Sequence, residues 1–149
     1  MNIKDTAYRY LSSRPRTCRQ MRDKLREKGF GEDEIEETIS ELTELGYLND
    51  EDYVVAYISY GFGKGKGMKL IRYELSARGV DNNTIEDGIH RYSEESDYDT
   101  VQGEYERAME IASKIDPFVP EKAARKLMSK GFESPVVWET VNKLKKDTE

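Results

Sequence analysis

The sequence predicts an all-α fold of three tandem three-helix repeats, stacked into an elongated, curved helical array. Two observations predict it: a segment that recurs about every 50 residues, and apolar residues spaced at i and i+4 within that segment. The recurring segment is found at residues 24–42, 74–92 and 126–144, which align without gaps. Units this short bury their apolar faces by stacking on their neighbours, so the repeats are expected to share a continuous core.

The recurring segment has the pattern of two helices joined at a glycine. The glycine supplies a left-handed residue after the first helix, and the apolar residue that follows it packs back on the last turn. These glycines are Gly29, Gly79 and Gly131. Apolar pairs at i and i+4 mark the core face of the first helix at Met21–Leu25, Ile71–Leu75 and Ala123–Leu127. The corresponding pairs of the second helix are Ile35–Ile39, Ile85–Ile89 and Val137–Val141.

Several helix starts carry capping signals. Thr17 followed by Gln20 has the pattern of a capping box, and Gly67 occupies the position of Thr17 in the second repeat. Ser134 before Pro135 predicts an N-cap followed by proline at the first helical position. Asn49 or Asp50 is expected to cap the helix that follows.

A further helical run precedes each of these helix pairs, at residues 5–13, 50–60 and 104–115. Ala7, Ala56 and Ala108 occupy matching places in these runs. The repeats are therefore expected to span residues 1–48, 49–97 and 98–149. Residues 93–103, "SEESDYDTVQG", are acidic and serine-containing, and they predict a loop that serves as a flexible joint before the third repeat.

The composition limits the cellular setting. No apolar run approaches the roughly 18 residues that a membrane span requires, and the N-terminal residues lack the apolar core of a signal peptide. Cys18 is the single cysteine of the 149 residues, so no internal disulfide can form. These features agree with a reducing cytoplasm, and we expect a cytoplasmic protein without a membrane anchor.

No motif predicts catalysis. The stretch "GFGKGKGMKLIR" at residues 61–72 resembles a phosphate-binding loop, but Lys66 stands where the second glycine of that motif belongs, and no serine or threonine follows. His90 is the single histidine and is expected at the surface, while Cys18 shares the core face of Met21 and Leu25. No histidine or cysteine cluster has the spacing of a zinc site. We therefore expect no enzyme activity, no metal and no cofactor.

Charge is segregated along the chain, although the net charge is −6. Residues 1–30 carry +6 and residues 53–80 carry +4, while residues 31–52 and 81–106 carry −10 and −8. Basic residues recur at equivalent positions of the first two repeats and form a stripe on one helix face. This stripe is either an ordinary solvated face or a contact for an anionic partner, such as DNA phosphate or an acidic protein surface. The candidate binding residues are Arg16, Arg19, Arg22, Arg26, Lys64, Lys66, Lys69 and Arg72.

The layout of residues 7–58, followed by "GKGKGMKLIRYELSARGV" at residues 63–80, resembles the RecX family of regulators of the RecA recombinase. The closest parts are the basic glycine-rich join, the helix after it and the "EL" and "GV" pairs that end this stretch. The resemblance covers nearly the whole chain and is looser in the third repeat. It implies an all-α array of three-helix repeats that binds the RecA nucleoprotein filament and has no catalytic residues.

On this resemblance the chain is expected to be a monomeric regulator, most simply an inhibitor, of RecA in DNA repair and recombination. Single- or double-stranded DNA is a further expected partner. Two alternatives stay open: a helical protein that binds DNA independently of RecA, and a generic adaptor between proteins. A gel shift would identify the first alternative, and a pull-down that recovers only another partner would identify the second.

Overall fold

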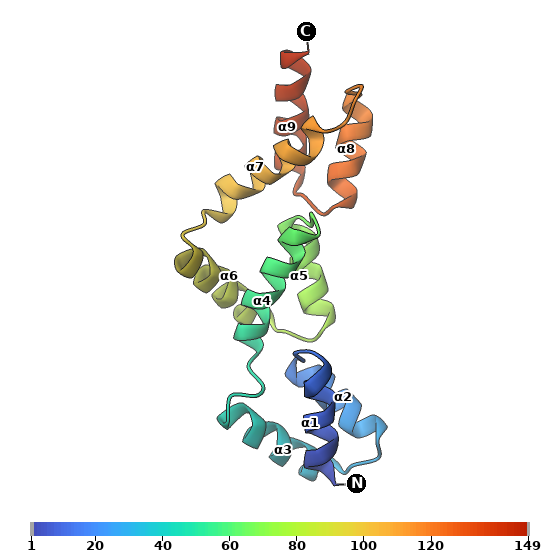
Figure 1. The fold of residues 1–149 in the computed structure, drawn as a ribbon, viewed down its shortest axis with the longest axis vertical. Coiled ribbons are helices and arrows are strands. Elements are labelled where there is room, and N and C mark those ends of the chain that lie inside the picture. Colours follow the sequence, from blue (N-terminus) through green and yellow to red (C-terminus); the bar gives the residue numbers. More distant parts are fainter. Residues whose placement is uncertain (1, 149) are drawn as a thin grey trace. The chain divides into compact units, whose positions relative to one another are not determined.

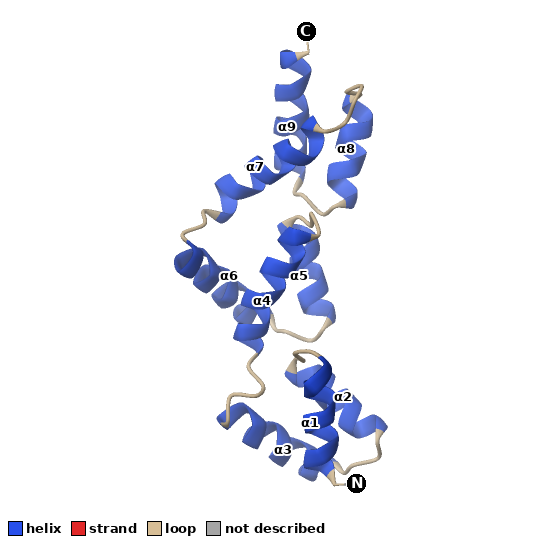
Figure 2. Ribbon diagram, viewed as in Figure 1, coloured by secondary structure: helices blue, strands red, loops and turns tan. Residues whose placement is uncertain are grey.

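The computed structural model describes residues 2–148, which form nine α-helices and no β-strand (Figures 1 and 2). The prediction of an all-α fold is confirmed. The helices are α1 Ile3–Ser13, α2 Cys18–Glu27, α3 Glu32–Glu44, α4 Asp50–Gly63, α5 Met68–Ala77, α6 Asn82–Ser96, α7 Thr100–Ser113, α8 Pro120–Ser129 and α9 Ser134–Asp147.

The helices group into two compact units. The first unit comprises the chain up to Ala56 together with Leu75–Gly88, and the second comprises Tyr57–Glu74 together with the chain from Ile89 onward. The predicted division into repeats at residues 1–48, 49–97 and 98–149 stays a prediction, as does the curved shape of the array.

In the first unit, α1, α2 and α3 pack around one apolar core. Met21 and Leu25 of α2 and Ile35 of α3 are fully buried, as the i, i+4 spacing predicted. Cys18 is half-buried against the same core, in agreement with its predicted place on that face. The buried members of this core are Ile3, Ala7, Met21, Leu25, Ile35, Ile39, Leu42 and Leu48.

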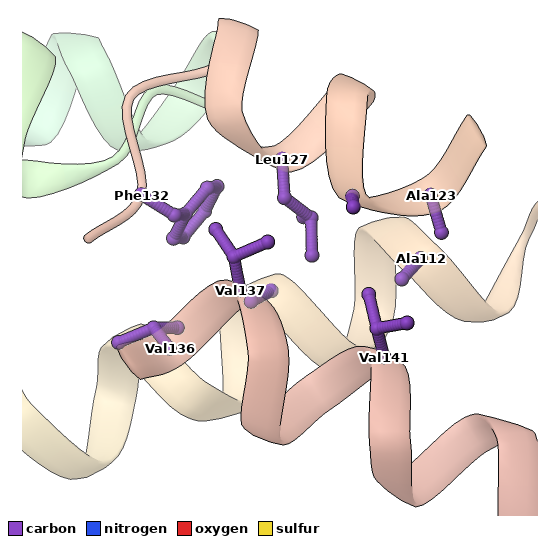
Figure 3. Close-up of a cluster of buried hydrophobic side chains, with 9 residues drawn as sticks. Ala112, Ala123, Leu127, Phe132, Val136, Val137 and Val141 are labelled. Carbon is purple, nitrogen blue, oxygen red and sulfur yellow. The ribbon is translucent and has the colours of Figure 1, made fainter. Parts of the chain in front are cut away.

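In the second unit, α7, α8 and α9 enclose an equivalent core (Figure 3). Leu127 of α8 points between the helices toward Val137 of α9, and Phe132 closes the end of the cluster beside Val136. The buried members are Ala108, Ala112, Ala123, Ala124, Leu127, Phe132, Val136, Val137 and Val141. The predicted core faces of the third segment are therefore confirmed.

The three predicted glycine turns are confirmed. Gly29, Gly79 and Gly131 have φ angles of 90°, 89° and 88°, in the left-handed region that a side chain disfavours. At the first turn, the N–H of Gly29 donates to the carbonyl of Arg26, and the N–H of Phe30 donates to that of Leu25. The same two bonds follow α5 and α8, so each of these helices ends in a Schellman motif.

Two of the predicted caps are confirmed, and one is wrong. The side chain of Thr17 accepts the Gln20 N–H while Gln20 accepts the Thr17 N–H, which completes the capping box. Asn49 caps α4 by accepting the Asp52 N–H. Helix α9 begins at Ser134, so its N-cap is Glu133, without a side-chain hydrogen bond. Proline is tolerated at either the first or the second position of a helix. The Ser-Pro pair therefore predicts the first residue of the helix only to within one residue.

The matching of Ala56 with Ala7 and Ala108 is wrong. Ala7 and Ala108 are fully buried, but Ala56 is exposed, and α4 instead buries Val54 and Ile58. The buried positions of α4 differ by two residues from the predicted match. Because α4 has apolar residues on nearly every face, spacing alone does not select its buried side.

The loop predicted at residues 93–103 is also wrong. Helix α6 continues to Ser96 and α7 starts at Thr100, which leaves only three residues between them. Asp99 accepts the N–H groups of Val101 and Gln102 and so starts the next helix immediately. Polar composition predicted a loop here, but most of these residues form the end of α6, a cap and the start of α7.

Candidate partner-binding surface

Two of the predicted binding residues, Arg22 and Arg26, are engaged with carboxylates of α3. Arg22 bonds both oxygens of Glu36 at 2.6 and 3.2 Å, and Arg26 bonds both oxygens of Glu32 at 2.7 and 3.1 Å. The hydrogen bonds from Arg22 and Arg26 lower the pKa of Glu36 and Glu32 respectively. The acidic stretch that follows α2 in the sequence therefore neutralises part of the predicted basic stripe.

Arg16 and Arg19 differ in how many contacts their side chains make within the protein. The guanidinium of Arg16 lies 3.8 Å from the centroid of the Tyr10 ring and donates to the Tyr10 carbonyl and the Ser13 hydroxyl, so it holds the end of α1. Arg19 is more exposed, and its Nε lies 3.9 Å from a carboxylate oxygen of Asp23. Of these two side chains, Arg19 is the more accessible to a partner.

The other four predicted residues lie in the second unit. Lys66 bonds both carboxylate oxygens of Glu74 at 2.7 and 3.0 Å, and only 20% of its side chain is exposed. Lys64 lies 5.8 Å from the Tyr60 ring. Lys69 is exposed and Arg72 is half-buried. The assignment of these residues to a binding surface stays a prediction.

A basic pocket that the sequence analysis missed lies between α1 and α2. Its volume is about 610 Å³, and its lining contains three cations, Arg9, Lys24 and Lys28, and no carboxylate. None of the three makes an ion pair with a described residue. The remaining lining residues are Thr6, Tyr10, Ser13 and Phe30. The i, i+4 spacing of Lys24 and Lys28 places them on one side of α2, but spacing within α2 does not reveal that Arg9 of α1 faces them.

The start of α2 is docked on residues far along the chain in the same unit. The hydroxyl of Thr17 donates to the carbonyl of Arg78 at 2.7 Å, on the glycine turn after α5. The N–H of Cys18 donates to the Asp50 carboxylate, at the start of α4, at 2.9 Å. Burial and then the Asp50 carboxylate raise the pKa of the Cys18 thiol, which therefore stays protonated at neutral pH.

The start of α5 is docked in an equivalent way in the second unit. The N–H of Gly67 donates to the carbonyl of Lys130 at 2.7 Å, on the glycine turn after α8. The N–H of Met68 donates to the Glu104 carboxylate of α7 at 3.0 Å. Lys130 corresponds to Arg78, so each contact joins a second-helix start to the glycine turn of the next repeat. We call these two contacts the helix-start junctions.

The carboxylate of the second junction is buried. Glu104 is 6% exposed, and it is paired with Arg107, which also donates to the Lys66 carbonyl and covers the Phe62 ring. Burial raises the pKa of the Glu104 carboxyl, while the Met68 N–H and Arg107 act in the opposite direction. This network ties α7 to the loop before α5.

Replacing Thr17 with alanine is expected to lower the free energy of unfolding by about 1 to 2 kcal/mol, because it removes an N-cap and the bond to Arg78. Serine keeps the hydroxyl, so Thr17→Ser is the matched control and should lose less than half as much. Urea denaturation followed by circular dichroism measures both. Equal losses in the two variants would contradict a role for the hydroxyl.

Metal sites and membrane-spanning helices are absent from the described residues. Residues 2–148 contain no group of three or more histidine, cysteine or carboxylate side chains placed to hold a metal ion. Within the same range, every helix is too short or too polar to cross a membrane. His90 is exposed beside Glu94, at the surface as predicted.

The nine helices, the three glycine turns and the two helix-start junctions define the class: an all-α protein of repeated three-helix units. Comparison with known families agrees with this class. The first three-helix domain of RecX matches residues 4–42, and the second matches residues 49–89. The chain belongs to the RecX family of regulatory proteins, as its sequence pattern indicated.

Individual relatives extend the match beyond these domains. Regulatory protein RecX of Clostridium perfringens is 34% identical over 136 residues, which are 89% of this chain and 64% of the relative. The protein of that name from Caldanaerobacter subterraneus subsp. tengcongensis is 30% identical over 93% of this chain and 68% of its own length. The chain thus spans about two thirds of these relatives, and 49% of the Bacillus subtilis relative.

The fold matches a solved structure of the family. The crystal structure of RecX from Lactobacillus salivarius superposes with a TM-score of 0.81 at 28% sequence identity. The match covers 96% of this chain and 94% of that one, so it includes all three helix triplets. The part of the chain after residue 89 therefore shares the family fold as well.

Proposed function

We propose that this chain regulates the RecA recombinase by binding the RecA–DNA filament, and that it acts as an inhibitor. The observation that carries the proposal is the match of residues 4–42 and 49–89 to the two RecX domains. The chain acts as a monomer through its surface, without catalysis. Binding along the filament blocks the addition of subunits or holds the filament in one state.

Two features of the fold support this role. The helix-start junctions give each unit a fixed arrangement of helix faces, which is what a binding surface without a deep cleft requires. Exposed cations occur on equivalent positions of α2 and α5, namely Arg19 and Lys69, so each unit offers one such charge to an anionic surface. A filament of identical subunits repeats any such surface along its length.

The test measures RecA ATP hydrolysis on single-stranded DNA and filament length by electron microscopy, with the chain added at increasing concentration. We expect both to fall at concentrations of the chain below those of RecA. The Leu127→Ala variant is the control for correct packing, because it keeps every surface residue but loses core packing. Unchanged hydrolysis and length at several micromolar wild-type chain would contradict the proposal.

A second candidate function is DNA binding without RecA, which the exposed side chains of Arg19 and Lys69 favour. Gel shifts on single- and double-stranded DNA at two salt concentrations would detect it, with affinity falling as salt rises. Reversal of Arg19, Arg22, Lys69 and Arg72 to glutamate should abolish it. Binding that survives these four changes would identify the stripe as a solvated face.

A further inference from the structure

The three equivalent glycine turns differ in what covers them. A Cβ built on Gly79 would lie 2.5 Å from the Cβ of Arg19, and one built on Gly131 would lie 2.2 Å from the Cβ of Leu70. A Cβ built on Gly29 meets nothing within 4 Å. The turn after α2 is therefore the one uncovered member of the three, although its backbone has the same conformation.

The chain itself shows what kind of element covers such a turn. At Arg78 and Gly79 it is the first turn of α2, and at Lys130 and Gly131 it is the first turn of α5. In both cases donors at the helix start reach the carbonyl groups of the turn. At the second turn, the N–H groups of Lys69 and Leu70 both point to the Gly131 carbonyl, at 3.1 and 3.4 Å. A helix start is thus the complementary element for this turn.

The basic pocket lies directly beside the uncovered turn, because Lys28 and Phe30, which flank Gly29, both line it. Its cations have no carboxylate partner in the described chain. The next repeat differs, since Glu74 occupies the position of Lys24 and is neutralised by Lys66. Of the turns after α2 and α5, only the turn after α2 therefore combines an uncovered glycine with cations that no carboxylate neutralises.

We propose that the turn at Lys28–Gly29 and the pocket formed by Arg9, Lys24 and Lys28 together bind the start of an acidic helix on a protein partner. This inference rests on the proposed function, in which that partner is the RecA filament. The N–H groups of the helix start donate to the turn carbonyls, as those of α5 do in the second unit. Carboxylates are favoured in the first turn of a helix by its dipole, and there they meet the three cations.

Nucleic acid fits this surface less well. Phosphates have no donors for the turn carbonyls, and these carbonyls end α2, at the negative pole of its dipole. The Tyr10 ring, which single-stranded bases would use for stacking, already has the Arg16 guanidinium at 3.8 Å from its centroid. Phe30 is half-buried against the core of α1, α2 and α3. The surface therefore favours a protein helix over a DNA strand.

The experiment compares the wild-type chain with a triple variant, Arg9→Glu, Lys24→Glu and Lys28→Glu. The control makes the same charge change with Lys122→Glu, Lys145→Glu and Lys146→Glu, at exposed positions of α8 and α9. Fluorescence anisotropy of each labelled chain measures binding to RecA filaments on single-stranded DNA and, separately, to the same DNA without RecA. A charge-keeping variant, Arg9→Lys, Lys24→Arg and Lys28→Arg, verifies that charge is the cause.

We expect the triple variant to bind filaments at least tenfold more weakly than the control, and DNA alone as the control does. The charge-keeping variant should bind filaments like wild type, and unchanged thermal melting establishes that all variants fold. Equal filament binding by the triple variant and the control would overturn this inference while leaving the proposed function intact. A parallel loss of binding to DNA alone would also overturn it, because the pocket would then be a phosphate site. Failure of the wild-type chain to bind filaments would overturn both proposals.

Discussion

Replacing Gly131 with alanine is expected to lower the free energy of unfolding by about 3 kcal/mol or more, whereas Gly29→Ala should cost only about 1 to 2 kcal/mol. Both residues have φ near +90°, so both variants carry the same left-handed strain. Only at Gly131 does the added Cβ meet a neighbour, since it would lie 2.2 Å from the Cβ and 2.8 Å from the backbone nitrogen of Leu70. Overpacking of this kind typically adds about 1 to 3 kcal/mol.

The measurement is urea denaturation of both variants, followed by circular dichroism. Gly29→Ala is the matched control, because it isolates backbone strain from the loss of the second helix-start junction. The variants should also differ in hydrogen exchange: the Gly67 and Lys69 amides, which donate to the turn after α8, should exchange faster in Gly131→Ala. Equal destabilisation by the two substitutions would contradict the close approach of α5 to this turn.

Replacing Leu127 with alanine is expected to destabilise the second unit by about 2 to 5 kcal/mol, the range for truncation of a fully buried leucine. Leu127 lies at the centre of the cluster between α8 and α9 (Figure 3). Its loss leaves a cavity that α7, α8 and α9 fill only in part. Thermal melting and urea denaturation should both report the change.

The neighbouring Met128 provides the control. It lies on the same helix and is 45% exposed, so Met128→Ala should change the free energy of unfolding by no more than about 0.5 kcal/mol. Comparable losses at both positions would place the core on a different face of α8 and would contradict the cluster described above.

Local patterns in the sequence predicted the helices and their ends where a single residue type has one physical role. Glycine followed by an apolar residue predicted the Schellman turns, and threonine followed by glutamine predicted the capping box at Thr17. Such predictions depend only on neighbours in the chain. The wrong predictions arose where composition fits two structures. Most of the polar residues at 93–103 belong to the ends of α6 and α7 rather than to a loop, and α4, which has apolar residues on nearly every face, buries Ile58 rather than Ala56.

The candidate surface was less predictable. Charge spacing along α2 identified Arg22 and Arg26, but it did not reveal that Glu36 and Glu32 of α3 bind them. Charge spacing also did not predict that Arg9 lines one pocket with Lys24 and Lys28, because the three side chains come from two different helical segments. Whether a surface cation is available to a partner depends on the side chains opposite it.

By itself, the sequence determined the all-α class, the repeat and the three left-handed glycines, because backbone preference and apolar spacing act over a few residues. Only the tertiary structure decided what each glycine does. Gly29, Gly79 and Gly131 share one local pattern and one φ angle, yet two are covered by a helix start and one is open. The reason is that coverage depends on the first turn of another helix, at Arg19 or Leu70, far from the glycine in sequence and adjacent to it only after folding.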